Sequence, residues 1–115
     1  MVSRELLKGS LKSIVLKLLA ENGRMYGYEI TQMVASLTKG QITLTYGALY
    51  PVLHKLEKEG ALITESEVVN NRNRIYYKLT KKGNETAREK IKELEDFIKT
   101  IGILLKPELG IEPCS

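Results

Sequence analysis

The sequence predicts one mainly α-helical domain of the α+β class, in which three helices and a two-stranded hairpin precede a long final helix. Three observations predict this fold. Apolar residues recur every three to four positions up to Gly60, they alternate with polar residues from Ala61 to Leu79, and they return to a heptad spacing from Ala87 onward. Because helices and strands have different side-chain periods, each change of period marks a change of element.

The first two helices are predicted at residues 3–21 and at about residues 26–38. Leucines share one face of the first helix, and Gly23 follows it as a stop signal. Gly40 ends the second helix. The segment 41–44, "QITL", is short and rich in β-forming residues, so we expect a small strand there.

The third helix is predicted to start at Thr43 or Thr45, either of which can cap its N-terminus, and to end at Gly60. Pro51 lies inside this helix, where a proline costs roughly 3 kcal/mol. A helical wheel places Pro51 and Gly47 opposite the apolar stripe, so the proline marks an outward surface. The apolar stripe consists of Leu49, Val52, Leu53 and Leu56.

Residues 61–79 predict a β-hairpin, because two β-rich segments, "ALITESEVV" and "RIYYKL", flank the polar turn "NNRN". Alternation along the second strand separates an inward face from a basic outward face. We expect Ile75, Tyr77 and Leu79 on the inward face, and Arg74, Tyr76 and Lys78 on the outward face.

A long helix is predicted from Lys81 to Lys106, with Thr80 as its N-cap. Its apolar residues form a heptad seam, which is typical of helix pairing. The seam consists of Ala87, Ile91, Leu94, Ile98, Ile101 and Leu105. It could pack on the first helix of the same chain, but a helix of about 25 residues reaches ~37 Å, more than so small a domain can cover. We therefore expect a homodimer interface, made by this seam together with Leu7 and Leu11.

These elements divide the chain into a domain of residues 1–80, a dimerisation helix of residues 81–106 and a flexible tail of residues 107–115. Helix, helix, short strand, helix and hairpin follow one another in the order of a winged helix-turn-helix.

Composition excludes several classes of protein. No apolar run approaches the ~20 residues needed to span a bilayer. The N-terminal segment mixes an acid and lysines with its apolar residues, unlike a signal peptide, so we expect a cytoplasmic protein. One cysteine, Cys114, and one histidine, His54, exclude an internal disulfide, a cysteine-based zinc site and a catalytic histidine pair. We expect no metal, no cofactor and no enzymatic activity.

The positive charge is concentrated in one segment. The chain has 18 basic and 14 acidic residues, a net charge of +4, and eight basic residues against two acidic ones lie between Asn70 and Lys92. Such a local excess is typical of a phosphate-binding surface. Basic residues also solvate exposed strand edges. Lys81 and Lys82 favour the phosphate interpretation, because they occupy the first turn of a helix, where acids are preferred.

Three segments resemble the signature segments of PadR-family transcriptional regulators: "YGYEI", "TYGALYPVLHKLEKEGAL" and "RIYYKLTKKG". The resemblance covers most of residues 6–83, and the single final helix is similar to that of the shorter subfamily. It implies a dimeric winged-helix repressor that binds DNA through its third helix and its hairpin, or wing, and that a small lipophilic or aromatic ligand releases. The chain departs from the family pattern at Tyr26, where many relatives have histidine, and at Ile75, where a basic residue is usual.

The N-terminal half of the third helix is expected to enter the major groove of DNA. From this helix we expect contacts by Thr45, Tyr46, Tyr50, His54 and Lys55. The outward strand face and the start of the final helix add Arg72, Arg74, Tyr76, Lys78 and Lys81. The two tyrosines of the third helix could instead be core aromatics; the wheel leaves this open for Tyr46 and favours DNA contact for Tyr50. The expected partner is a double-stranded, pseudo-palindromic operator, and the alternatives are a protein–protein adaptor and a non-specific DNA-binding protein.

Overall fold

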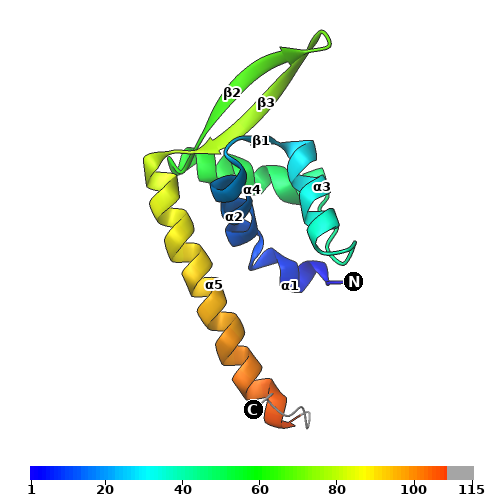
Figure 1. The fold of residues 1–115 in the computed structure, drawn as a ribbon, viewed down its shortest axis with the longest axis vertical. Helices are drawn as coiled ribbons and strands as arrows, with labels where there is room; N and C mark the ends of the chain where they lie inside the picture. Colours follow the sequence, from blue (N-terminus) through cyan, green and yellow to red (C-terminus); the bar gives the residue numbers. More distant parts are fainter. Residues whose placement is uncertain (109–115) are drawn as a thin grey trace.

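The computed structural model describes residues 1–108, which contain five helices and three strands. The helices are α1 (Arg4–Lys8), α2 (Leu11–Asn22), α3 (Gly27–Leu37), α4 (Tyr46–Lys58) and α5 (Lys81–Glu108), and the strands are β1 (Met25–Tyr26), β2 (Leu62–Val69) and β3 (Arg72–Leu79). Figure 1 shows the β2–β3 hairpin and α5 leaving the cluster of helices in opposite directions. The described chain is therefore elongated, with extents of 56 × 29 × 23 Å.

The core lies where α2, α3 and α4 meet the base of the hairpin. The predicted apolar stripe of α4 faces this core: Leu49, Leu53 and Leu56 are fully buried, and Val52 is partly buried against them. Leu16 of α2 and Ile30 of α3 complete the contact. Burial of these leucines and of Ile30 holds α4 in the domain despite its internal proline, since each buried side chain contributes about 1.5–3 kcal/mol.

The predicted first helix is interrupted, because the structure divides residues 3–21 into α1 and α2 at Gly9. The Ser10 backbone N–H and its hydroxyl both donate to the Leu7 carbonyl, at 3.0 and 3.1 Å. A serine that bonds to the preceding turn competes with helix continuation, and glycine has a low helix propensity. The break still leaves Leu7 and Leu11 buried together.

The strand predicted at "QITL" is wrong: residues 41–44 form no strand, and the third strand of the sheet is β1. Met25 and Tyr26 pair with Tyr77 and Tyr76 of β3, so the strand order is β1-β3-β2. In place of strand pairing, the Thr38 hydroxyl accepts the Ile42 N–H at 3.0 Å. A two-residue strand depends on the free edge that it meets, which local propensity does not describe.

The predicted hairpin is confirmed, with its turn at Asn70 and Asn71. Both residues have positive φ, 51° and 62°, as a two-residue hairpin turn of the primed type requires. The inward position predicted for Ile75 is wrong, because its side chain is 43% exposed, whereas Tyr77 is buried. Ile75 lines an open cleft between the hairpin and the helices, so no packed core covers it there.

Thr80 joins the hairpin to α5, as the predicted N-cap. Its hydroxyl accepts the Gly83 N–H at 3.0 Å and donates to the Gly60 carbonyl at 2.6 Å. Lys82, also in the first turn, donates to the Glu59 carbonyl at 2.8 Å. A cation at the carbonyl end of α4 is favourable, which gives Lys82 a structural reason to lie at the start of α5.

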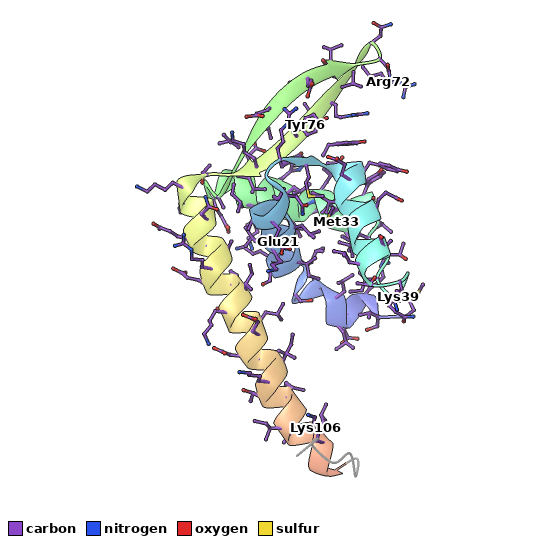
Figure 2. The ribbon with its side chains drawn as sticks, viewed as in Figure 1. Glu21, Met33, Lys39, Arg72, Tyr76 and Lys106 are labelled. Carbon is purple, nitrogen blue, oxygen red and sulfur yellow. The ribbon has the colours of Figure 1, made fainter. Side chains whose placement is uncertain are left out.

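Helix α5 has two different halves. In the first, Ala87 is buried against the core, Ile91 packs beside it, and the Ser13 hydroxyl donates to the Lys90 carbonyl at 3.4 Å. The second half leaves the domain, and Lys106 marks its far end in Figure 2. The helix reaches Glu108, two residues beyond the predicted end. The rest of the predicted tail, with Cys114, lies outside the described residues.

Candidate nucleic-acid interface

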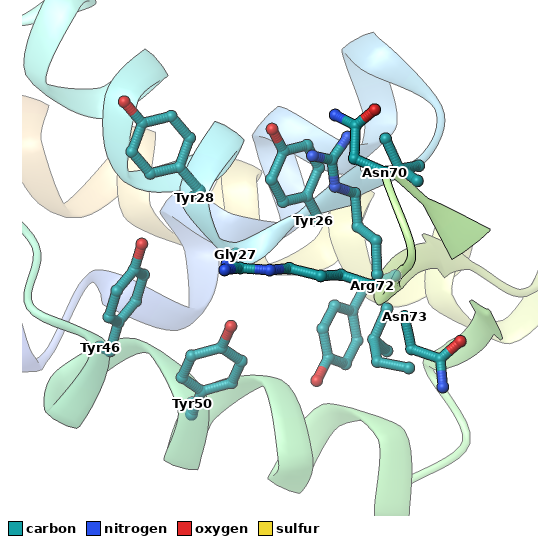
Figure 3. A pocket seen from close by; sticks show the side chains of 12 residues that line it. Tyr26, Gly27, Tyr28, Tyr46, Tyr50, Asn70, Arg72 and Asn73 are labelled. Carbon is teal, nitrogen blue, oxygen red and sulfur yellow. The ribbon is translucent and has the colours of Figure 1, made fainter. Parts of the chain in front are cut away.

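A cleft of about 860 Å³ lies between the hairpin and the N-terminal ends of α3 and α4. Figure 3 shows Tyr46 and Tyr50 on one side and Tyr26 and Tyr28 on the other, while Arg72 approaches from the hairpin. Arg74 also lines the cleft. Tyrosine rings and guanidinium groups are the side chains that stack and hydrogen-bond well at nucleic-acid surfaces.

The cleft wall formed by α4 is held at two points. The Thr45 hydroxyl caps the helix by accepting the Ala48 N–H at 3.2 Å. The Tyr50 hydroxyl packs against Gly27 at the start of α3, where an added Cβ would lie only 2.4 Å from the Tyr50 oxygen. Glycine at position 27 therefore leaves room for the Tyr50 ring against the start of α3.

Tyr46 is more exposed than Tyr50, whereas the helical wheel placed Tyr46 nearer the core. Tyr46 is 49% exposed at the mouth of the cleft, whereas Tyr50 is half-buried against α3. Their ring centroids lie 5.6 Å apart, and the Tyr50 ring lies 6.0 Å from the His54 ring. The three rings form a continuous aromatic row along α4.

The outward ribbon of α4 carries Gly47, Pro51, His54 and Lys55, all of them exposed. A Cβ at Gly47 would meet only the Thr45 hydroxyl, at 3.9 Å, so packing within the chain does not require glycine there. Pro51 has no N–H to donate to the Gly47 carbonyl, which leaves that exposed acceptor for solvent or a ligand. Thr45, His54 and Lys55 lie beside the cleft and do not line it.

On the hairpin, Arg72 and Arg74 differ from Lys78 in their ion pairing. The Arg74 guanidinium lies 4.1 Å from the centre of the Tyr26 ring, and neither arginine forms an ion pair among residues 1–108. Lys78 is paired with Glu65, Nζ to Oε2 at 3.2 Å. The two arginines are thus the available cations of the cleft. Lys78, Tyr76 and the exposed Lys81 do not line it.

The carboxylate of Glu65, in the hairpin, is held in its charged form. The ammonium group of Lys78, and then the guanidinium of Arg24, lower the pKa of Glu65 from its ordinary value. Burial raises the pKa of Tyr77, whose side chain lines the inner part of the cleft. Positive charge is therefore offset at the base of the hairpin and remains available toward its tip.

Sequence reasoning missed Arg24, Tyr26 and Tyr28 as site residues. The available signal was the pair of tyrosines around Gly27 in "YGYEI". Their role depends on the pairing of β1 with β3, which brings Tyr26 to within 5.5 Å of Tyr76, centroid to centroid, in an edge-to-face arrangement.

The residues predicted for dimerisation fall into three environments. Leu7, Leu11 and Ala87 are buried in the chain's own core, Ile91, Leu94 and Ile101 are half-buried, and Ile98 and Leu105 are exposed. Leu7 and Leu11 also line an apolar groove of about 350 Å³ between α1 and α4, together with Pro51 and Val52. Two exposed residues that the heptad pattern omitted, Phe97 and Leu104, widen the apolar face of the second half of α5.

Other kinds of site have no support within residues 1–108. No group of three histidine, cysteine, aspartate or glutamate side chains there is placed to hold a metal ion. None of the helices in this part of the chain has the length and apolar character needed to cross a membrane.

Comparisons with known proteins agree with this geometry. The family model described as "Transcriptional regulator PadR-like family" matches residues 15–89. The chain is 31% identical over 98 residues to the transcriptional regulator Rv3488 of Mycobacterium tuberculosis, which covers 85% of this chain and 88% of that protein.

Solved structures show the same architecture. A transcriptional regulator from Clostridium thermocellum superposes with a TM-score of 0.80 at 29% identity, over 89% of this chain and 99% of that one. Bacillus subtilis PadR in complex with operator DNA superposes with a TM-score of 0.62 at 26% identity, over 69% of this chain and 45% of the larger protein.

Proposed function

Because the chain belongs to the PadR-like family of transcriptional regulators, which are DNA-binding proteins and not enzymes, we propose that it is a dimeric, sequence-specific repressor. Its target is a pseudo-palindromic operator, and it acts in the cytoplasm. The observation that carries the proposal is the cleft, where two arginines without ion pairs face the aromatic row of α4. The related PadR of Bacillus subtilis, in complex with operator DNA, supports the assignment.

Helix α4 enters the major groove by its N-terminal half. Gly47 and Ala48 allow a close approach of the backbone, and the exposed side chains of Thr45, Tyr46, His54 and Lys55 reach base edges or phosphates. Tyr50, half-buried, contributes mainly by supporting the aromatic row.

The hairpin contacts the sugar–phosphate backbone of the DNA beside the groove. It does so through Arg72 and Arg74, which lie toward the tip of the hairpin. Tyr76 supports these contacts by packing against Tyr26. Lys81, which lies outside the cleft, contributes to the long-range attraction of DNA, and Lys78, paired with Glu65, contributes less.

A second copy of the chain covers the free half of α5. Phe97, Ile98 and Leu104 are each 60% exposed there, and apolar faces of this size mark interfaces. The apolar groove beside Leu7 and Leu11 belongs to the same interface, with the half-buried Leu94 and Ile101. An isologous dimer would present two α4 helices about 34–36 Å apart, one turn of DNA.

Release by a small lipophilic or aromatic ligand completes the proposal and rests on the family resemblance. The groove between α1 and α4, of about 350 Å³ and lined mainly by apolar side chains, suits a ligand of this class, which would then bind between the two copies. A panel of lipophilic compounds added to an operator-binding assay tests this part, and release by none of them would remove it.

Sequence preference is the decisive test of the repressor. We expect duplexes from the region upstream of the protein's own gene to bind at least about 1,000-fold more tightly than random duplexes, as specific regulators do. Fluorescence anisotropy at fixed salt measures both affinities. Equal binding would instead identify a non-specific DNA-binding protein, and binding to neither would favour the adaptor.

Arg74→Ala is expected to weaken binding to all DNA sequences by a similar factor. Loss of one phosphate contact also reduces the magnitude of the negative slope of log affinity against log salt concentration by about one. Lys17→Ala is the matched control, because Lys17 is an exposed cation of α2, away from the cleft. A change of preference at a single base pair, with an unaltered salt slope, would contradict a phosphate contact.

A further inference from the structure

Arg24, in the turn between α2 and β1, is packed onto the hairpin. Its Nη1 donates to Glu65 Oε1 at 3.2 Å, and its Nη2 donates to Glu67 Oε2. The same guanidinium lies 4.0 Å from the centre of the Tyr76 ring. One side chain therefore contacts both strands of the hairpin, β2 through the two carboxylates and β3 through the ring.

These contacts continue into the cleft through a row of four side chains, each in contact with the next. Arg24 covers Tyr76, Tyr76 meets Tyr26 edge to face, and Arg74 covers Tyr26. The members come alternately from the segment that follows α2 and from β3. These contacts link Arg24 to Arg74, one of the two available cations of the cleft.

Apart from the pairing of β1 with the base of β3, little else holds the hairpin at its angle. Its base is anchored by Leu62 and Tyr77, but Thr64, Val68 and Ile75 on the same face are exposed. Two strands without a covering layer are only marginally stable and bend easily. Contacts on the opposite face, where Arg24 lies, therefore have a large influence on where the tip of the hairpin points.

Arg24 is also poorly placed to bind phosphate itself. Two carboxylates already accept its N–H groups, and Glu67, followed by Glu65, raises the pKa of Arg24 through these hydrogen bonds. Arg24 does not line the cleft. Its charge is thus offset locally, unlike the charges of Arg72 and Arg74.

We propose that Arg24 is a positioning residue for DNA binding: it sets the angle of the hairpin against α3 and α4, and so holds Arg74 at the cleft without touching DNA. The inference rests on the proposed DNA-binding function. The site requires arginine, because only a planar guanidinium stacks on an aromatic ring while donating to two separate carboxylates.

Arg24→Lys tests the proposal with the charge retained. Operator affinity is expected to fall about fivefold to tenfold, because one cation–π contact and two exposed ion pairs are lost or weakened. The salt slope should stay at the wild-type value, since no phosphate contact is removed. A salt slope smaller in magnitude by about one would instead identify Arg24 as a phosphate contact. Unchanged operator affinity would show that Arg24 has no role in DNA binding.

The double substitution Glu65→Gln with Glu67→Gln gives the sharper test, because the two explanations predict opposite signs. Removal of two negative charges near DNA should tighten binding if only net charge matters. If the carboxylates hold Arg24 in place, binding should weaken by a factor similar to that of Arg24→Lys. Tighter binding would overturn the proposal.

Hydrogen exchange without DNA separates this inference from the proposed function. Backbone amides of β1 and β3 should exchange faster in Arg24→Lys than in the wild type, and Lys17→Ala, which removes a cation of α2, should leave them unchanged. Unaltered exchange in Arg24→Lys would contradict the positioning role of Arg24 even if DNA binding is confirmed. Failure of the wild type to prefer its own upstream DNA would overturn the function and leave the exchange result standing.

Discussion

Leu104→Asp is expected to convert the protein into a folded monomer that no longer binds its operator tightly. Leu104 is 60% exposed and lies on the half of α5 that leaves the domain, so the fold of residues 1–80 does not depend on it. A dimer would bury its side chain. An isologous interface contains the substitution twice, and an unpaired buried charge at each copy should weaken dimerisation about 1,000-fold or more.

Sedimentation equilibrium measures the mass, circular dichroism the helix content, and fluorescence anisotropy the operator affinity. Ile103→Asp is the matched control, because Ile103 is 74% exposed on the same helix but points away from the face that carries Leu104 and Ile101. It should remain dimeric and bind the operator. A dimer of Leu104→Asp with wild-type affinity would contradict the assigned interface.

Gly83→Ala is expected to destabilise the protein severely, although alanine is the better helix former by about 1 kcal/mol. A Cβ at position 83 would lie 2.0 Å from the Ala61 carbonyl oxygen and 2.9 Å from its carbonyl carbon. Backbone atoms cannot give way easily, and this oxygen also accepts the Thr80 N–H at 3.0 Å. We expect a loss of about 3 kcal/mol or more in the free energy of unfolding.

Thermal unfolding at a fixed protein concentration measures the effect, which should be a fall of about 10 °C or more in Tm. Gly102→Ala tests the same substitution on the same helix, where an added Cβ meets no atom within 4 Å. There the helix propensity should dominate and raise stability by about 0.5–1 kcal/mol. Equal effects at the two glycines would show that the junction at Ala61 does not require glycine.

Features that depend on neighbours along the chain were predictable from the sequence. The stripe of α4, the caps at Thr45 and Thr80 and the turn at Asn70 each follow from residues within about four positions of one another. Helix periodicity, capping and turn conformation are local properties, so a local pattern describes them well. The order of the main helices and the hairpin, and with it the winged-helix arrangement, followed from these local signals, but the place of the short strand did not.

The candidate site needed more than local patterns. Charge clustering indicated the hairpin as a basic surface, but it did not distinguish Lys78, paired with Glu65, from Arg74, which has no such partner among the described residues. The helical wheel identified the outward surface of α4, but it did not show that Tyr50 packs against Gly27 while Tyr46 is exposed. Both distinctions depend on residues far away in the sequence.

The sequence by itself determined the main helices, the hairpin and the order in which they follow one another, together with the two faces of α4 and α5, because side-chain period and capping act within one turn or one strand. Only the tertiary structure decided that β1, and not "QITL", joins the sheet, and that Arg24 reaches across it to Glu65 and Tyr76. A two-residue strand and an exposed arginine have no preference strong enough to predict these partners. The free edge of β3 and the distance between the packed elements select them.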